Sequence, residues 1–326
     1  MGNITLLDTA IGSSNRGDDI IMLSAEDELS NIMRGYFTIH VPTHLRAFSS
    51  LECLGNLPDS AREVYNSKYK FVCGTNLLSG NMLKRSNQWN IHYFNVRPIC
   101  GCVLVGVGAS ASHADWYTQL LYRKVLSSDY FHSVRDKKAY DLISGMGLKC
   151  LYTGCVSMWK LTPSFCKLIP TVKRPNVIFT LTDYKRDPEK DKIIISTLRK
   201  NYKKIFFWLQ GAHDLEYINE LTDTSDITMI PSTVKDYSRI FGFTQPGDAV
   251  DYVGTRLHAG IFAMRHSVRT IIIRVDSRMD EMACCIPNNT IARDDIINLE
   301  SMILSDLHTE CCLDWESIKQ WKEQFS

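Results

Sequence analysis

The sequence lacks an excess of charge of either sign. Its 326 residues include 37 Lys and Arg against 36 Asp and Glu, which gives a formal net charge of +1. Binding to a nucleic-acid backbone needs clustered and uncompensated Lys and Arg, so this balance argues against a protein that holds nucleic acid through a broad positive field. With 44% hydrophobic residues, the chain is not intrinsically disordered either. Its length corresponds to about two domains.

A long hydrophobic run is also missing. The longest uncharged stretch, Pro98–Ser112, is shorter than the roughly 20 apolar residues of a membrane-spanning helix, and glycines interrupt it. The first residues contain no basic region followed by an apolar one, which a secretory signal requires. We therefore expect a cytoplasmic protein.

The spacing of metal-binding cysteines is absent as well. The sequence has 11 cysteines but no Cys-x-x-Cys pair, and Cys284–Cys285 and Cys311–Cys312 are directly adjacent. Cytoplasmic thiols stay reduced, and structural zinc sites usually begin with closely spaced cysteine pairs. We therefore expect reduced thiols and no bound metal ion.

The sequence does contain a regular alternation of β-branched runs with helical patterns. In the first half this pattern predicts strands over 4–9, 69–73, 102–107 and 131–134, and helices over 17–33, 60–66, 114–126 and 136–144. In the second half it predicts strands over 177–181, 204–208, 227–230, 251–254 and 270–274, and helices over 188–202, 213–221, 234–241 and 256–266. Such alternation is typical of parallel sheets in α/β proteins.

A proline-containing stretch, 161–176, separates the two halves and is interpreted as a linker. The predicted fold class is therefore α/β, with one domain over 1–165, a second over 176–310, and a cleft between them. In open α/β sheets ligands bind beyond the carboxyl ends of the strands. The strand-to-helix turns are accordingly the candidate sites.

The first candidate turn contains Asn15, Arg16, Asp18 and Asp19. Backbone N–H groups at the start of the following helix, together with Arg16, could hold an anion or a sugar hydroxyl. An ordinary capped helix, with Asp18 or Asp19 near the positive end of the helix dipole, is the structural alternative. The turn fits neither the dinucleotide-binding nor the P-loop pattern.

The second candidate turn contains Arg135 and Asp136. An arginine at a strand end can present a bidentate fork to a carboxylate or a phosphate. An ion pair of Arg135 with Asp136, which can also cap the next helix, explains the residue equally well. The turn 210–214 is a weaker candidate that could line the cleft, although helix capping is the favoured interpretation.

The most unusual turn follows the strand predicted over 251–254. Thr255 can cap the next helix, and Arg256 and His258 lie in its first turn. Both groups add to the positive end of the helix dipole, which is unfavourable unless something negative binds there. Bonds from these side chains to backbone carbonyls are the structural alternative. Small residues let this helix pack closely: Ala259, Gly260 and Ala263.

These turns resemble motifs of the polysaccharide pyruvyl transferase family. The most specific parts are Arg-Leu-His at 256–258 and Ser-Val-Arg-Asp at 133–136, and the resemblance runs from about residue 3 to about residue 287. Thr75 replaces a usual glycine, a change that affects backbone shape more than charge. The matching segments are 15–20, 73–78, 133–136, 153–159, 253–259, 270–273 and 276–282.

The resemblance implies two Rossmann-like domains similar to GT-B glycosyltransferases, with the active site in the cleft. By this analogy, residues 311–326 form a C-terminal helix that crosses back and packs on the N-terminal domain. The resemblance also implies phosphoenolpyruvate as donor, without a cofactor or a metal. The implied acceptor is a sugar of a bacterial cell-surface polysaccharide, such as an exopolysaccharide or capsule, or of its precursor, which could be a lipid-linked oligosaccharide.

The implied donor-binding residues are Arg135, Arg256, Leu257 and His258. Phosphoenolpyruvate carries a carboxylate and a phosphate, and each needs a cationic partner. His258 either binds the phosphate or is the catalytic acid that protonates the enol methylene, which makes the neighbouring carbon electrophilic.

Acceptor binding is assigned by loop position to Asn15, Arg16, Asp18 and Asp19, and Asp18 is also the candidate catalytic base. The leading alternative function is a GT-B glycosyltransferase that uses a nucleotide sugar in polysaccharide biosynthesis, because Arg256 could hold a diphosphate.

The C-terminal tail is predicted to form amphipathic helices over 294–304 and 313–325. Trp315, Ile318 and Trp321 share one helical face, which we expect to pack on the body of the protein. If the acceptor is lipid-linked, exposed aromatic side chains of this tail could instead contact the inner face of the membrane.

Overall fold

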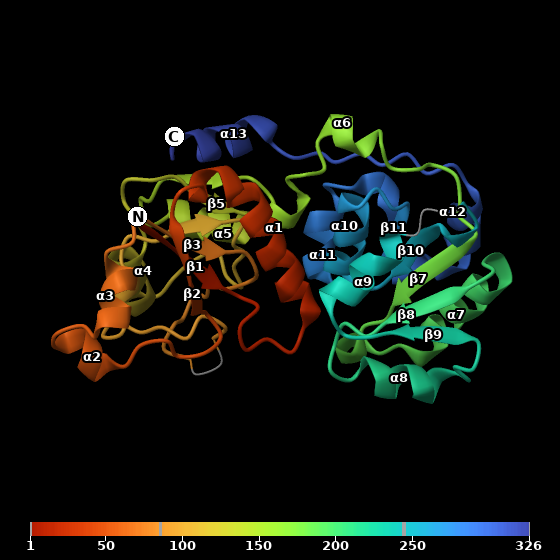
Figure 1. Ribbon diagram of the computed structural model, residues 1–326, viewed down its shortest axis with the longest axis horizontal. Helices are drawn as coiled ribbons and strands as arrows, with labels where there is room; N and C mark the ends of the chain where they lie inside the picture. Colours follow the sequence, from red (N-terminus) through yellow and green to blue (C-terminus); the bar gives the residue numbers. More distant parts are fainter. Residues whose placement is uncertain (1, 85–86, 243–245, 326) are drawn as a thin grey trace. The chain divides into compact units, whose positions relative to one another are not determined.

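The computed structural model describes residues 2–84, 87–242 and 246–325 (Figure 1). Contacts between residues divide the chain into two units. The first comprises the described parts of Met1–Ser13, Ile21–Trp159 and Leu313–Ser326, and the second comprises Ser14–Ile20 and the described parts of Lys160–Cys312. The predicted α/β fold with parallel sheets is confirmed.

The first unit is built on a four-stranded parallel sheet in the order β2-β1-β3-β4. The order reverses at β1, because the chain adds β2 on one side of it and β3 on the other. Strand β3 carries a run of four buried residues, Lys70–Cys73, as expected for a strand covered on both faces. The strands are β1 (Asn3–Asp8), β2 (Phe37–Pro42), β3 (Tyr69–Cys73) and β4 (Val103–Val105).

A separate pair of parallel strands, β5 (His132–Val134) and β6 (Cys150–Tyr152), continues the first unit next to β4. Side chains carry part of this junction. The N–H of Leu104 in β4 donates to His132 Nδ1 at 3.2 Å, and the N–H of Gly106 donates to the Ser133 hydroxyl at 2.8 Å.

The helices of the first unit include α1, of which only the first turn groups with the second unit. The C-terminal helix α13 contacts β5 and β6. Its Trp321 is fully buried and packs on Phe71 and Trp159. The helices are α1 (Arg16–Met33), α2 (Ser50–Leu54), α3 (Asp59–Tyr65), α4 (Trp116–Val125), α5 (Lys137–Ser144) and α13 (Trp315–Glu323), with short 3-10 turns at Arg97–Ile99 and Val156–Met158.

The second unit is built on a six-stranded parallel sheet in the order β12-β11-β10-β7-β8-β9. Counted from β7, this is the strand order of the Rossmann fold, which reverses between β7 and β10. The strands are β7 (Asn176–Thr180), β8 (Ile205–Trp208), β9 (Ile227–Ile230), β10 (Val250–Gly254), β11 (Thr270–Arg274) and β12 (Thr290–Ala292).

Helices pack against this sheet through two sets of side chains. Residues of α7, α8 and α12 share one hydrophobic core with β7, β8, β10 and β11. Helices α9 and α10 contribute Tyr237 and Phe262, which pack on one another, and Tyr237 also stacks on Trp208. The helices are α6 (Pro163–Cys166), α7 (Pro188–Asn201), α8 (Asp214–Leu221), α9 (Val234–Phe241), α10 (Leu257–Arg265), α11 (Ser277–Ala283) and α12 (Leu299–Leu304).

Close packing of α10 on the sheet is confirmed. A Cβ atom added at Gly260 would lie 2.5 Å from Ile272 Cγ1, and Ala259 and Ala263 are fully buried. The helix therefore approaches β11 more closely than any larger residue at position 260 would permit.

The structure differs from the predictions at several elements. Strand β2 was not predicted, and only Val41 in it is buried. The stretch 161–176 contains the short helix α6, which Thr162 caps, and Lys160 already groups with the second unit. The helix predicted over 294–304 is a 3-10 segment, Arg293–Asn298, followed by α12.

Of the helices that the structure describes, none has the length and apolar character needed to cross a membrane.

Candidate active site

The strand order of the second unit locates a candidate site at the carboxyl ends of β7 and β10. Ligands of open α/β sheets bind where the strand order reverses, beyond the carboxyl ends of the strands. The turns that follow β7, β8 and β10 meet there, since side chains from all three contact one another. These turns contain Leu181 to Asp183, Gln210 to Asp214, and Thr255 to Arg256.

Arg256 joins these three turns. Its side chain is only 4% exposed, and Nε donates to the Leu181 carbonyl at 3.0 Å. Its Nη2 donates to Asp183 Oδ1 at 2.8 Å and also to Asp214 Oδ1. Two carboxylates therefore neutralise the positive charge of the guanidinium. They offset the free-energy cost of burying a cation at the start of α10.

Asp214 is the most buried member of this cluster. Its side chain is fully buried, and Oδ2 accepts the N–H groups of Gln210 at 2.9 Å and Gly211 at 2.7 Å. Burial raises the pKa of the Asp214 carboxyl above its ordinary value, whereas the Arg256 guanidinium acts against that rise. Both oxygens of the carboxylate have partners, so the residue holds the 210–214 turn and Arg256 together.

Gly211 lies directly against the ion pairs. A Cβ atom added at this position would be 2.4 Å from Arg256 Nη2, 3.0 Å from Asp214 Oδ1 and 3.2 Å from Asp183 Oδ2. Only glycine lets the backbone of this turn approach the guanidinium so closely.

The turn around Asn15 belongs to the same network within the second unit. Gln210 Nε2 donates to Asn15 Oδ1 at 2.9 Å, and the N–H of Arg16 donates to the Gln210 carbonyl at 3.1 Å. Asn15 and Gly211 also form an antiparallel bridge. A continuous chain of contacts thus leads from Asn15 through Gln210 and Asp214 to Arg256.

The other predicted acceptor residues lie at the start of α1. Asp18 is buried, and Arg16 Nη1 lies 3.4 Å from Asp19 Oδ2. The Asn15 side chain accepts the N–H of Gly17 at 3.0 Å and so caps the helix. The structural alternative, a capped helix with acidic residues in its first turn, is therefore present here.

Leu257 and His258 begin helix α10, and both are half-buried. The predicted cap is wrong. The N-cap position is occupied by Arg256, without a side-chain cap, and the Thr255 hydroxyl instead pairs with the Thr182 hydroxyl at 2.8 Å. Thr255 therefore ties β10 to the turn after β7, which leaves the N–H groups of the first turn of α10 without that cap.

Arg135 lies in the first unit, at the end of β5. Its side chain is 11% exposed, and Nε is 3.7 Å from Asp136 Oδ2. Asp136 caps α5 as predicted, because Oδ1 accepts the Ala139 N–H at 2.8 Å. A Cβ atom at Gly108 would lie 2.4 Å from Arg135 Nε and 2.8 Å from Asn76 Oδ1, so both side chains cover that glycine.

The second unit thus contains the predicted acceptor residues together with Gln210: Asn15, Arg16, Asp18 and Asp19. The same unit contains Arg256, which is directly followed by Leu257 and His258 at the start of α10. It places Arg135 in the other unit. The roles of all these residues in binding and catalysis stay predictions.

Asp183 was not predicted as a member of the site, and Asp214 was predicted only as part of the weaker candidate turn 210–214. Each follows a predicted strand, and the rule that ligands bind at strand ends was the available signal. Arg256 lies 73 residues after Asp183 and 42 residues after Asp214. No local sequence pattern predicts that these residues pair.

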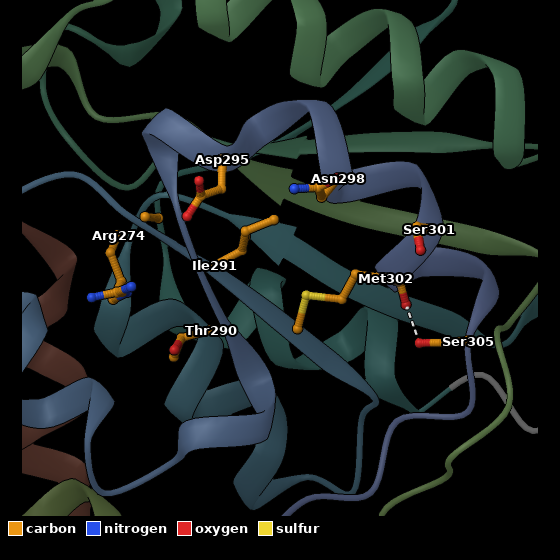
Figure 2. A pocket seen from close by; sticks show the side chains of 9 residues that line it. Arg274, Thr290, Ile291, Asp295, Asn298, Ser301, Met302 and Ser305 are labelled. Carbon is orange, nitrogen blue, oxygen red and sulfur yellow. Dashed lines mark hydrogen bonds between the residues drawn. The ribbon is translucent and has the colours of Figure 1, made fainter.

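Two cavities lie beside the edge strand β12 of the second unit. One, of about 370 Å³, is open between β12 and α12, where the Ser305 hydroxyl donates to the Met302 carbonyl (Figure 2). The other, of about 400 Å³, shares Arg274 and Ala292 with it and also contacts Lys190 and Arg293. Neither is lined by Arg256 or His258. Their linings mix cations with several aspartates, which gives no preference for an anion.

The fold and the site define a parallel α/β protein whose second unit, with Rossmann strand order, presents an Arg-Leu-His turn where that order reverses. The sequence profile of one family, polysaccharide pyruvyl transferase, matches residues 15–277. The chain belongs to the polysaccharide pyruvyl transferase family, and it is therefore a transferase.

Two further comparisons add little. No curated protein matches the chain. Among solved structures, the crystal structure of Arabidopsis thaliana UGT89C1 complexed with quercetin is similar over 99% of this chain and 94% of that one, at 8% identity and a TM-score of 0.38. A similarity at this level carries no functional argument.

Proposed function

We propose that the protein transfers the pyruvyl group of phosphoenolpyruvate to a sugar of a bacterial cell-surface polysaccharide or its precursor and forms a pyruvate ketal. The observation that carries the proposal is the network from Asn15 through Gln210 and Asp214 to Arg256. It joins the segments 15–20 and 253–259, which resemble motifs of the family, at the point where the strand order of one sheet reverses.

In this proposal the Arg-Leu-His turn binds the donor. Arg256 is held by two carboxylates and cannot move freely, so it fixes the start of α10, and the N–H groups of that first turn form a rigid surface for an anion. Leu257 and His258 complete the donor contacts, and Arg135 is assigned to the donor as well. Hydrogen-bond donors that are already fixed in place need little rearrangement when the transition state forms.

The chemistry needs one acid and one base. His258 donates a proton to the methylene carbon of the enol, and the neighbouring carbon becomes electrophilic. One acceptor hydroxyl adds to that carbon and loses its proton to Asp18. A second hydroxyl then attacks the same carbon as its C–O bond to phosphate breaks, and the leaving inorganic phosphate takes up the proton of that hydroxyl. Asn15, Arg16 and Asp19 orient the acceptor, and no metal or cofactor is part of the proposal.

Phosphate release from phosphoenolpyruvate in the presence of acceptor tests the assignment. His258→Gln should lower the rate by about 10²- to 10³-fold, which corresponds to the loss of one transition-state contact. His266→Gln is the matched control, because His266 is exposed at the other end of the same helix, and it should turn over like the wild type. Wild-type turnover of the His258 variant would refute the mechanism.

Ligand binding separates this proposal from a glycosyltransferase. A ligand that binds only the folded protein raises its unfolding temperature. Phosphoenolpyruvate should do so here, whereas a nucleoside diphosphate should not. The opposite result would favour the nucleotide-sugar alternative.

A further inference from the structure

A buried tyrosine of strand β10, Tyr252, holds the backbone at the start of helix α10. Its side chain is fully buried, and its hydroxyl donates to the Arg256 carbonyl at 2.9 Å. The same carbonyl accepts the N–H of Gly260 at 3.2 Å, which is the first hydrogen bond of the helix. The Arg256 carbonyl therefore has two donors, one from the helix itself and one from the sheet beneath it.

The hydroxyl of Thr180, at the carboxyl end of β7, completes this contact. It lies 2.6 Å from the Tyr252 hydroxyl. A carbonyl oxygen cannot donate, so the single hydroxyl proton of Tyr252 goes to Arg256, and the Thr180 hydroxyl donates to the Tyr252 oxygen. Burial raises the pKa of the Tyr252 phenol well above its ordinary value, so the group keeps this proton at neutral pH.

Two glycines make room for Tyr252. A Cβ atom added at Gly254 would lie 2.8 Å from the Tyr252 hydroxyl oxygen and 2.5 Å from Thr180 Oγ1. One added at Gly260 would lie 3.0 Å from Tyr252 Cε1. The tyrosine therefore fills the space between the end of β10 and the first turn of α10, and its hydroxyl stays fixed against the Arg256 carbonyl.

The bond from Tyr252 also sets the direction of a backbone N–H group. A trans peptide unit is planar, and its C=O and N–H groups point in opposite directions. Because Tyr252 and Gly260 fix the Arg256 carbonyl, the N–H of Leu257 in the same peptide unit points out of the start of α10. The first N–H groups of an α-helix have no partner within the helix and can bind an anion.

We propose that Tyr252 is a positioning residue for the donor, a role that rests on the function proposed above. It fixes the peptide unit between Arg256 and Leu257, so that the N–H groups at the start of α10 are aimed at an anionic group of phosphoenolpyruvate. Because Tyr252 is fully buried, it acts through this backbone and not by contact with the donor. Asp183 and Asp214 differ from it, because they hold the side chain of Arg256.

Tyr237 provides a matched comparison on the same helix. It is also fully buried, and its hydroxyl donates to the Ala259 carbonyl at 2.9 Å. The peptide unit of that carbonyl contains the N–H of Gly260, which is already bonded to the Arg256 carbonyl within the helix. Loss of the Tyr237 hydroxyl should therefore change stability without changing the N–H groups at the helix start.

Binding of phosphoenolpyruvate to three proteins tests the proposal. Isothermal titration calorimetry gives the dissociation constants of the wild type, Tyr252→Phe and Tyr237→Phe, and urea unfolding gives their stabilities. Each variant loses one buried hydrogen bond, so their stabilities should fall by similar amounts. Only Tyr252→Phe should bind phosphoenolpyruvate more weakly, by about three- to tenfold, the factor expected for the loss of one hydrogen bond.

Equal dissociation constants for the two variants would overturn the proposal, because they would show that Tyr252 only stabilises the fold. A wild type that does not bind phosphoenolpyruvate would overturn the proposed function as well, which separates the two failures. Thr180→Val removes the hydroxyl that donates to Tyr252 and should weaken binding in the same direction. It takes the place of Tyr252→Phe if that variant does not fold, and wild-type affinity would then be the contrary result.

Discussion

Gly211 and Arg256 show how closely the site depends on single atoms. The backbone of Gly211 lies against the guanidinium and both of its carboxylate partners, at distances that leave no room for a Cβ atom. Arg256 has a long side chain, but its guanidinium is held by hydrogen bonds to Leu181, Asp183 and Asp214, so it cannot move aside easily. A larger residue in place of Gly211 should therefore change both the stability of the protein and the position of Arg256.

Gly211→Ala should destabilise the protein by about 1 to 3 kcal/mol, the usual range for overpacking. The added methyl group would have to displace Nη2 of Arg256 or the backbone of the 210–214 turn. Urea unfolding measures the change. Gly247→Ala is the control, because nothing lies within 4 Å of a Cβ atom there, and its unfolding free energy should match the wild type. Equal stability of the two variants would contradict the geometry.

Only those features of the site that lie within a single turn could be predicted from the sequence. The unusual charge at Arg256 and His258 is visible in one turn, because a helix dipole makes two such groups costly. The carboxylates that neutralise Arg256 lie in other turns, and their approach depends on which strands are neighbours. Asp183, and the pairing of both aspartates with Arg256, therefore required the structure.

Among the elements, β4 and β5 are joined through an imidazole that must be neutral. His132 Nδ1 accepts the Leu104 N–H, so that nitrogen carries no proton, and Nε2 donates to the Ser127 carbonyl at 2.9 Å. Burial lowers the pKa of His132 to about 4, from an ordinary value near 6.5. Protonation would put a hydrogen on Nδ1, where it would face the N–H of Leu104, and the hydrogen bond to β4 would break.

Acid should therefore loosen this junction. Because the folded protein binds the proton of His132 less tightly than the unfolded chain does, the stabilisation is fully present above about pH 6.5 and is lost as the pH falls towards 4. The loss should reach about 3 kcal/mol, at 1.4 kcal/mol per pH unit. Urea unfolding across this range measures it.

His132→Gln should remove this part of the pH dependence, and the exposed His113→Gln should leave it as in the wild type. If the wild type and His132→Gln lost stability in parallel from pH 6.5 to 4, the imidazole would not be the group responsible.

The elements that the sequence predicts best are short strands rich in apolar and β-branched residues. Strands β9 and β11 begin and end at the predicted residues, because such runs, when turns bound them, have few other interpretations. Strand β2 alternates apolar and polar residues from Phe37 to Val41, but Val41 is its only buried residue, and its pairing with β1 is visible only in the structure.

At the scale of the whole molecule, each of the two units is built from segments that are not contiguous in the sequence. Residues 14–20 group with the second unit, and residues 313–325 group with the first, although the chain reaches them last. The first unit is thus completed by its final segment. Trp321, Ile318 and Phe325 of that segment belong to the same hydrophobic core as β1 and β3.

Trp321→Ala should consequently destabilise the first unit, by about 3 to 5 kcal/mol, the usual cost of a buried tryptophan or phenylalanine truncated to alanine. Hydrogen exchange should speed up in β3, β5 and β6, which α13 or Trp321 contacts, while the amides of β7 and β10 keep wild-type protection. Trp116→Ala is the control, because that side chain is 75% exposed, and it should change stability by less than about 0.5 kcal/mol.

Trp321→Phe separates packing from hydrogen bonding in the same place. The buried Nε1 of Trp321 has no hydrogen-bond partner among the described residues, so replacing the indole by a phenyl ring removes an unsatisfied donor along with some contact area. Its loss of stability should therefore be much smaller than that of Trp321→Ala. Equal losses for the two variants would show that the indole N–H has a partner, and faster exchange in β7 and β10 would show that α13 does not stabilise the first unit alone.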